Sequence, residues 1–299
     1  MGIAALLAVT VAGVVAGAIN TIIGSGSLVT YPVMVLLGVP PISANVANTV
    51  GLAPGAVAGA YSYRTFMHEG DSAAAVSAPS AFTLSRGRIS GLSLCAAGGA
   101  LIGAGLLLRV SASTFTLIVP FLIALATVLV ACQPRLARMV SAHDDGSGAL
   151  PVSSARLGVL ALLVVCGAVY GGFFSAAQGI IFLAILGVFL PGSIHTHNAL
   201  KNLLQAIVNV VAALFFIVVA IAVAAGAQDP TLSVTSPLSG TLDTRMWIAA
   251  ACVAVGSLIG SPLGAWIGVR IPARVLRISV VIFGACMAVL MAVRACTIP

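Results

Sequence analysis

The first 63 residues read MGIAALLAVTVAGVVAGAINTIIGSGSLVTYPVMVLLGVPPISANVANTVGLAPGAVAGAYSY (residues 1–63) and contain no Asp, Glu, Lys, Arg or His. A helix that crosses the hydrocarbon core of a membrane needs about 20 apolar residues, so this stretch has room for about three of them. Its apolar residues do not alternate with polar ones, as the strands of a membrane β-barrel would require. The stretch therefore predicts several consecutive membrane-spanning helices.

The rest of the chain has the same character. Charged residues make up 6% of the 299 residues, hydrophobic residues 61%, and the mean hydropathy is +1.20. A soluble protein carries about 25% charged residues, so this composition excludes a soluble domain and a disordered chain. We predict an all-α polytopic membrane protein with a single membrane domain over residues 1–299. Because no Lys or Arg precedes the first apolar stretch, we interpret it as a retained span rather than a signal peptide.

Internal similarity indicates a duplication. Three short motifs occur twice in the same order, with offsets of 157, 154 and 153 residues. The pairs are Gly99-Ala-Leu-Ile-Gly103 with Gly256-Ser-Leu-Ile-Gly260, Gly13-x3-Gly17 with Gly167-x3-Gly171, and Asn45 and Asn48-Thr49 with Asn198 and Lys201-Asn202. We predict a first repeat over 1–132, a linker over 133–156 and a second repeat over 157–299.

Each repeat divides into five apolar segments, of which the second is short. The expected segments are 3–22, 27–38, 43–63, 90–108 and 114–132, then 157–176, 180–191, 199–225, 247–268 and 275–294. The short ones follow the breakers Gly24-Ser-Gly26 and Gln178-Gly179 and end before Pro40-Pro41 and Pro191-Gly192. Broken helices at matched positions of two repeats point to the binding site of a transporter. We expect about eight full spans.

The basic residues test the orientation of the repeats. If every segment crosses and the N-terminus lies outside, ten of the thirteen Lys and Arg residues fall on the cytoplasmic side. If the short segments do not cross, five Lys and Arg residues fall on one side of the membrane and eight on the other. The positive-inside rule therefore favours two inverted repeats, a periplasmic N-terminus and a cytoplasmic linker.

The few ionisable residues limit the function. All six carboxylates lie between apolar segments, which disfavours a carrier that binds cations or relays protons through Asp or Glu. The only lysine, Lys201, stands beside a broken segment among amides spaced along one helical stripe: Asn198, Asn202, Gln205 and Asn209. The equivalent stretch of the first repeat offers Asn45, Asn48 and Thr49. These residues predict a polar cavity with one positive charge, suited to an anion.

Simpler interpretations stay open for each of these residues. Lys201 could mark the cytoplasmic end of a helix, and the amides could join helices to one another. The backbone N–H groups of Gly24, Ser25, Gly26 and Ser27, matched by Gln178 and Gly179, could bind an anion, or the glycines could serve close helix packing. His195 and His197 could couple proton movement to transport, or lie in a surface loop.

Other functions find no support in the sequence. It contains no Walker A loop, GxSxG elbow, HExxH motif or Rossmann fingerprint, so we expect neither an enzyme nor a cofactor. The basic residues are scattered singly, unlike a nucleic-acid-binding patch. The six cysteines show no metal-ligand spacing.

Several motifs resemble those of the sulfite exporter TauE/SafE family. They are Gly13-x3-Gly17, Ile23-Gly-Ser-Gly26, Pro32, Gly38-Val-Pro-Pro41 and Ala44-x3-Asn48-Thr49, then Tyr170-Gly-Gly-Phe-Phe174, Ala177-Gln-Gly179 and Ala199-Leu-Lys201-Asn202. The resemblance spans nearly the whole chain and implies a bacterial inner-membrane transporter of sulfur-containing anions. One departure is Ser175-Ala-Ala177, where the family usually has a glycine, a small residue and a glycine before Gln-Gly.

The sequence thus predicts a secondary transporter of sulfite, sulfonates, thiosulfate or similar anions that works by alternating access. A membrane scaffold or assembly subunit without transport activity, and an anion channel, are the alternatives. The predicted substrate-binding residues are Gly24, Ser25, Gly26, Ser27, Asn45, Asn48, Thr49, Gln178, Gly179, Asn198, Lys201 and Asn202, with His195 and His197 as candidates for proton coupling.

Overall fold

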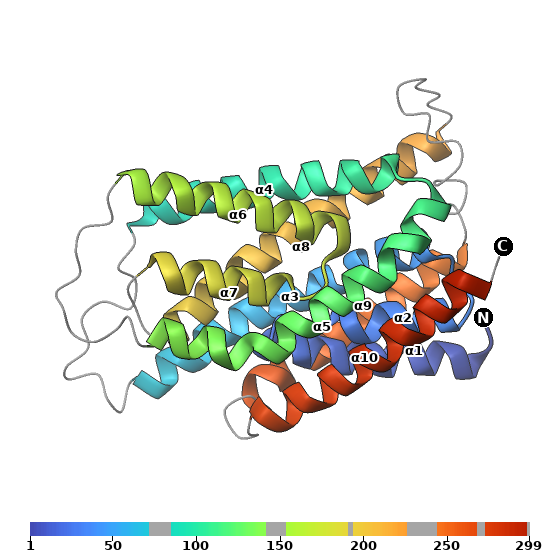
Figure 1. Cartoon of the computed structure of the whole chain (residues 1–299), viewed down its shortest axis with the longest axis horizontal. Helices are drawn as coiled ribbons and strands as arrows, with labels where there is room; N and C mark the ends of the chain where they lie inside the picture. The colour runs from blue at the N-terminus through green and yellow to red at the C-terminus, as the bar shows by residue number, and fades with distance from the viewer. Residues whose placement is uncertain (72–84, 142–153, 191–193, 226–243, 268–272, 298–299) are drawn as a thin grey trace.

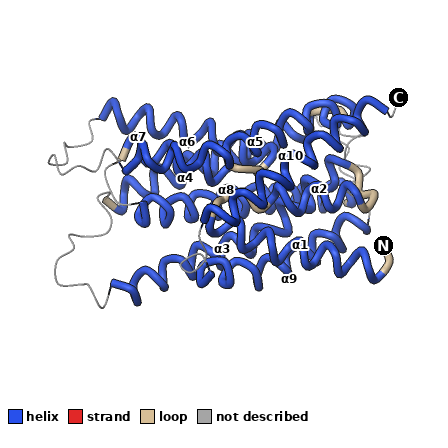
Figure 2. The backbone as a smooth tube through the Cα atoms, turned by 60° about the horizontal axis from the view of Figure 1, so that its bottom comes forward, coloured by secondary structure: helices blue, strands red, loops and turns tan. Residues whose placement is uncertain are grey.

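The computed structural model describes residues 1–71, 85–141, 154–190, 194–225, 244–267 and 273–297. These residues form ten helices and, within those ranges, no strand (Figures 1 and 2). The helices are α1 (Ile3–Ile22), α2 (Ser27–Leu36), α3 (Pro41–Asp71), α4 (Arg86–Arg109), α5 (Ala112–Ser141), α6 (Ser154–Phe174), α7 (Gln178–Phe189), α8 (Ile194–Ala224), α9 (Thr244–Ile267) and α10 (Ala273–Thr297).

The ten helices correspond one to one with the ten apolar segments expected from the sequence. Some run further, since α3 continues to Asp71 and α5 to Ser141, well into polar sequence. Six helices are long and apolar enough to cross a membrane, namely α1, α4, α5, α6, α8 and α9. Large apolar side chains such as Leu94 and Phe121 are more than 70% exposed, as expected for surfaces that face lipid. The chain is therefore a multi-pass membrane protein.

Two helical hairpins contain the breaks predicted from the sequence. The α1–α2 hairpin turns at Gly24, which has φ +86°, and the α6–α7 hairpin turns at Ala177, which has φ +57°. These two residues are 153 positions apart, the offset of the Asn/Lys motif. Figure 1 shows α1 entering from the end that carries both termini and α6 entering from the opposite end. The two tips meet, because the Gly179 N–H donates to the Gly24 carbonyl at 3.1 Å.

The glycine motifs that occur twice in the sequence lie at helix–helix interfaces. Gly17 of α1 packs against α9 so closely that a Cβ there would lie 2.9 Å from the Ser257 Cα. Gly99 of α4 packs in the same way against α6, 2.6 Å from the Val165 carbonyl oxygen. Small residues allow such close backbone approach between membrane helices. Each of these interfaces joins a helix of the first repeat to a helix of the second.

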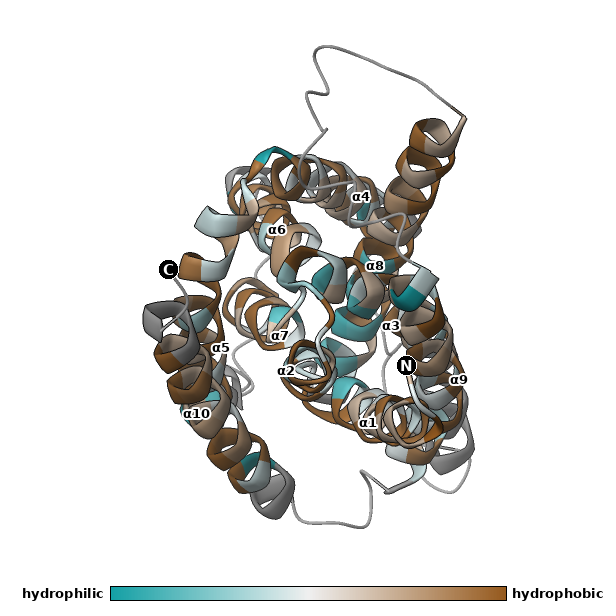
Figure 3. Ribbon diagram, turned by 90° about the vertical axis from the view of Figure 1, so that its right-hand side faces the viewer, coloured by the Kyte–Doolittle hydropathy of each residue, from teal (hydrophilic) through white to brown (hydrophobic). Residues whose placement is uncertain are grey.

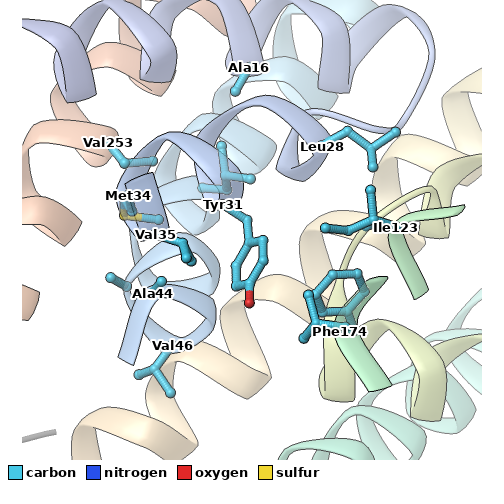
Figure 4. Close-up of a cluster of buried hydrophobic side chains, with 14 of the residues drawn as sticks. Ala16, Leu28, Tyr31, Met34, Val35, Ala44, Val46, Ile123, Phe174 and Val253 are labelled. Carbon is cyan, nitrogen blue, oxygen red and sulfur yellow. The ribbon is translucent and has the colours of Figure 1, made fainter. Parts of the chain in front are cut away.

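The helices form two units, and each unit combines helices from both halves of the sequence. We define the first unit as α1, α2, α3 and α9, and the second unit as α4, α6, α7 and α8. One apolar core is built entirely from the second unit. A larger core runs through the first unit and through α5 and α10, which pack against each other. It also includes residues of the second unit, such as Leu107, Phe174, Ile180 and Phe216. Figure 4 shows part of this larger core, where Tyr31 of α2 meets Phe174 of α6 edge to face at 5.4 Å between ring centres.

Polar side chains collect between the two units. Figure 3 shows hydrophilic residues around α8 and α3 in the middle of a bundle whose periphery is apolar. The buried polar residues include Asn20, Asn48, Gln178, Lys201 and Gln205, each at most 5% exposed. A polar interior surrounded by apolar helices marks the place where a functional site is to be sought.

Candidate functional site

The α6–α7 break is filled by a neutral cluster of polar side chains, which we define as Ser27, Thr30, Asn45, Asn48 and Ser175. The Ser27 and Ser175 hydroxyls lie 3.0 Å apart, and the Asn48 amide donates to both, at 2.9 and 3.1 Å. The Thr30 hydroxyl donates to the Asn48 carbonyl oxygen, and the Asn45 amide donates to the Phe173 carbonyl at 2.8 Å. Ser27, Thr30, Asn48 and Ser175 therefore satisfy one another, and Asn45 ties the cluster to the end of α6.

The α1–α2 break faces a different arrangement, which contains a buried lysine. Lys201 of α8 is fully buried, and its Nζ donates to the Thr21 carbonyl near the end of α1 at 3.3 Å. One turn further along α8, the Gln205 amide donates to the Asn20 side-chain oxygen at 2.6 Å. That oxygen also accepts the Gly26 backbone N–H at 3.4 Å, which fixes the orientation of both amides.

A narrow crevice lies between α1, α3 and α8. Its lining includes Thr21, whose carbonyl accepts a hydrogen bond from Lys201, and Asn202, the next residue along α8. It has a volume of about 160 Å³ and leaves no room for a water molecule in this conformation. We call it the lysine crevice, and its lining residues are Asn20, Thr21, Ala56, Gly59, Asn202 and Gln205. The site is thus closed, and a ligand can enter only if the helices around it move.

The lysine crevice has unused hydrogen-bonding capacity. The Asn202 Nδ2 and the Gln205 Oε1 are buried without a partner. Leaving such a group unsatisfied costs about 1–3 kcal/mol, and a buried ammonium without a counter-charge costs more. In the described part of the chain no carboxylate is buried near Lys201. An anion in the crevice would offset these costs at once.

The two sites lie at positions that the sequence offset of 153 residues relates to each other. The offset of 153 residues places Asn48 of α3 opposite Lys201 of α8, and each contacts the break of the other repeat. The long helix of one half therefore completes the broken hairpin of the other half. The sites differ in charge, because one has an asparagine where the other has the lysine.

The structure brings most of the predicted site residues into this central region and buries them. Several of the expected anion-binding amides have partners within the protein: Gly24 N–H donates to Ile19 at 3.1 Å, Gly26 N–H to Asn20 and Gly179 N–H to Gly24. The Thr49 hydroxyl donates within its own helix, to the Asn45 carbonyl at 3.0 Å. Asn198 is half-buried and lines neither site.

Ser25 and Gln178 occupy equivalent positions at the two breaks. Both are fully buried, and the Ser25 hydroxyl and both polar atoms of the Gln178 side chain have no partner. Gln178 lies against Gly171, where a Cβ would come within 2.9 Å of its Cγ. Its side chain therefore packs towards α6 and does not line the lysine crevice.

Of the two histidines predicted as candidates for proton coupling, the structure describes the side chain of His197. His197 is buried, and its Nε2 lies 3.1 Å from the Leu190 carbonyl at the end of α7. It stands one turn before Lys201 on α8. The side chain of His195 lies outside the described part of the structure.

Six residues of these sites were not among those predicted from the sequence: Asn20, Thr21, Thr30, Ala56, Gly59 and Ser175. Asn20 and Thr21 are polar residues in an apolar helix directly before a break, which is a signal that the sequence carries. The role of the Thr21 backbone carbonyl has no such signal, because any residue would supply that atom.

One comparison with known proteins identifies a family. The family model described as "Sulfite exporter TauE/SafE" matches residues 9–291, which include every residue of the two sites. No curated protein and no solved structure matches the chain. On this evidence, the chain belongs to the sulfite exporter TauE/SafE family.

Proposed function

We propose that the protein is a secondary transporter that moves small sulfur-containing anions (sulfite, sulfonates, thiosulfate or similar) across the bacterial inner membrane. The observation that carries the proposal is Lys201, a fully buried lysine whose described contact is a backbone carbonyl, beside a crevice with an unpartnered amide donor. Lysine and amide N–H groups are suitable ligands for an oxyanion. The membership of the family supports the sulfur-containing class.

Alternating access would proceed by movement of the first unit against the second. The hydrogen bonds that join the two units lie around the two breaks. They include the bonds of Ser27 with Ser175, Asn48 with Ser175 and Lys201 with Thr21. Such contacts can exchange with water or substrate when the units separate, whereas the apolar core of the second unit would stay intact. A crevice too narrow for water supports a carrier rather than an open channel.

The inverted arrangement of the repeats is part of the proposal. The opposite directions of α1 and α6 in Figure 1 support it, as does the equivalent geometry at Gly24 and Ala177. Adding α3 and α10 to the six candidate spans gives about eight full spans, and the short helices α2 and α7 count as crossings as well. With five crossings in each repeat, the N-terminus is periplasmic and the linker is cytoplasmic.

Cysteine labelling tests the topology. Arg88 and Arg109 are exposed at the two ends of α4. In a background without native cysteines, we expect a membrane-impermeant maleimide to label Arg109→Cys in intact cells and Arg88→Cys only after the membrane is opened. Labelling of both from the same side would contradict the topology.

Anion flux into proteoliposomes tests the function. We expect radiolabelled sulfite or methanesulfonate to enter vesicles containing the protein faster than empty vesicles. Lys201→Met should lower the initial rate about 10- to 100-fold, because a hydrogen bond to a charged group contributes about 1.5–3 kcal/mol.

The matched control for this variant is Arg88→Met, which removes an exposed positive charge far from the crevice. It should retain the wild-type rate. If Lys201→Met, folded and reconstituted to the same level, transports every tested anion as fast as Arg88→Met, the role of Lys201 is refuted.

A further inference from the structure

We infer that Asn20 of α1 is a ligand of the transported anion, and that the bound anion joins the two units by accepting hydrogen bonds from both Asn20 and Asn202. The inference rests on the proposed function and adds to it the side chain of the first unit that binds the substrate. It follows from the hydrogen bonds of the residues that line the lysine crevice.

Two donors fix the orientation of the Asn20 side chain. Its Oδ1 accepts the Gln205 Nε2 at 2.6 Å and the Gly26 backbone N–H at 3.4 Å. Because only the oxygen of an amide accepts hydrogen bonds, the opposite atom is the donor Nδ2. Asn20 is 5% exposed and lines the crevice, and both of its described hydrogen bonds use the oxygen. Among the described residues, its Nδ2 is therefore available to a ligand.

Asn20 is the side-chain donor that the first unit contributes to the crevice. The other lining residue of α1 is Thr21, whose hydroxyl donates to the Gly17 carbonyl at 3.2 Å. The lining residues of α3 are Ala56 and Gly59, whose side chains have no polar atoms. On the side of the first unit, the described lining of the crevice thus offers an anion one available amide.

The second unit contributes a matching donor from α8. The Asn202 Nδ2 is buried without a partner, whereas the Gln205 Nε2 already donates to Asn20. Lys201, the residue before Asn202, supplies the positive charge. An anion in the crevice therefore meets one amide donor from each unit.

An anion held in this way favours the closed conformation. The crevice is too narrow for water, so α1 and α8 have to separate before an anion enters. An oxyanion has several acceptor oxygens, and the hydrogen bonds from Asn20 and Asn202 to these oxygens span the space between the units. A ligand that contacts both units binds more tightly when they are close, so it shifts the population toward the closed arrangement.

The Asn20→Asp variant separates the role of the oxygen from that of the nitrogen. The carboxylate still accepts from Gln205 and Gly26, but an oxygen that repels anions replaces the Nδ2 donor. We expect the anion-free variant to unfold in detergent at a temperature no lower than that of the wild type, because the carboxylate also gives Lys201 a counter-charge. Its affinity for sulfite and methanesulfonate, measured from the anion-induced rise in unfolding temperature, should fall more than about 10-fold.

The matched control is Asn198→Asp. Asn198 lies on α8, one turn before Lys201, and lines neither site. The variant makes the same substitution and adds the same charge near Lys201 without changing the lining of the crevice. It should therefore lower the affinity for either anion much less than Asn20→Asp does.

Hydrogen exchange in the wild-type protein tests the joining of the units without any substitution in the crevice. The Gly179 N–H of the second unit donates to the Gly24 carbonyl of the first unit at 3.1 Å, so its exchange reports separation of the two. We expect a saturating concentration of sulfite to slow exchange in peptides that contain Gly179. In Asn20→Asp the same concentration should have no effect.

The outcomes separate this inference from the proposed function. Sulfite binding by Asn20→Asp as tight as by the wild type, or an equal loss of binding in Asn198→Asp, would overturn the role of Asn20 and leave anion transport in place. Exchange at Gly179 that sulfite does not slow would overturn the joining of the units by the anion. If neither sulfite nor methanesulfonate stabilises the wild type or enters its proteoliposomes faster than empty vesicles, both proposals are refuted.

Discussion

At the scale of the residue, one difference between the repeats sets the chemistry. Asn48 and Lys201 occupy equivalent places, yet Asn48 belongs to a saturated network and Lys201 borders a crevice with unused hydrogen-bonding capacity. A buried neutral amide is stable once its hydrogen bonds are made, whereas a buried ammonium also needs a counter-charge. The first site can therefore serve as a structural contact, and the second is suited to a ligand.

The conformation of Gly24 leads to a prediction about the stability of the protein. Its φ of +86° suits only glycine well, and a Cβ there would lie 2.6 Å from the Gly179 Cα. We expect Gly24→Ala to lower the unfolding free energy by more than about 3 kcal/mol, because backbone strain of about 1–3 kcal/mol adds to the clash between the two breaks. Thermal unfolding in detergent measures the change.

Gly38 is the matched control for Gly24. It has nearly the same φ, +87°, but a Cβ there would meet nothing within 4 Å. Gly38→Ala should therefore show the backbone strain alone. Equal losses of stability in the two variants would contradict a close contact between the tips.

Many residues of the site could be predicted from the sequence, but the partners with which they form hydrogen bonds could not. The lone lysine, the stripe of amides and the glycine breaks are visible in the sequence because polar residues are rare in apolar helices. The partners of these residues lie more than a hundred positions away, as for Lys201 and Thr21, and one partner is a backbone carbonyl. Tertiary packing chooses such partners, so residue type alone does not reveal them.

At the scale of the element, close helix packing organises the molecule. The α1–α9 and α4–α6 interfaces use the glycine motifs that mark the duplication, Gly13-x3-Gly17 with Gly256-x3-Gly260 and Gly99-x3-Gly103 with the α6 backbone. Similarity between the motifs indicated the repeat, but not that three of the four glycine motifs pack on a helix of the other repeat, whereas Gly167-x3-Gly171 faces α7 of its own repeat. That exchange depends on the three-dimensional order of the helices.

Gly17 tests the packing of α1 on α9. A Cβ at Gly17 would lie 2.7 Å from the Ser257 carbonyl oxygen, so α1 must move away from α9 to accommodate it. We expect Gly17→Ala to lower the unfolding free energy by about 1–3 kcal/mol, as measured by thermal unfolding in detergent.

Gly105 on α4 is the control for Gly17, because a Cβ there would meet nothing within 4 Å. Gly105→Ala should leave stability unchanged or raise it by up to about 1 kcal/mol, since alanine favours the helix over glycine. A loss of stability as large as that of Gly17→Ala would mean that helix packing is not the cause.

At the scale of the whole molecule, the sequence halves are not the packing units. The second unit takes α4 from the first repeat and α6, α7 and α8 from the second, and these four helices share one apolar core. A motion of one sequence half against the other would break the α1–α9 and α4–α6 interfaces. Movement of the two units against each other would break the polar contacts around the site, together with apolar contacts such as those between α3 and α8 and between Tyr31 and Phe174.

A disulfide between the hairpins tests this motion. The Ser27 and Ser175 hydroxyls are 3.0 Å apart and belong to different units. In a background without native cysteines, we expect the Ser27→Cys/Ser175→Cys protein to lose transport when oxidised and to regain it when reduced. Each single variant should be insensitive to oxidation. Full transport by the quantitatively cross-linked protein would contradict separation of the units at this contact.

The central claim is that an anion binds beside Lys201, between α1, α3 and α8, and it can be tested by locating one. Hydrogen selenite is a monoanion whose selenium gives an anomalous signal in crystals of the protein. The account predicts one peak within hydrogen-bonding reach of the Lys201 Nζ and the Asn202 Nδ2, which disappears in Lys201→Met. A peak at the neutral cluster around Asn48, or one beside Lys201 that persists in Lys201→Met, would contradict the account.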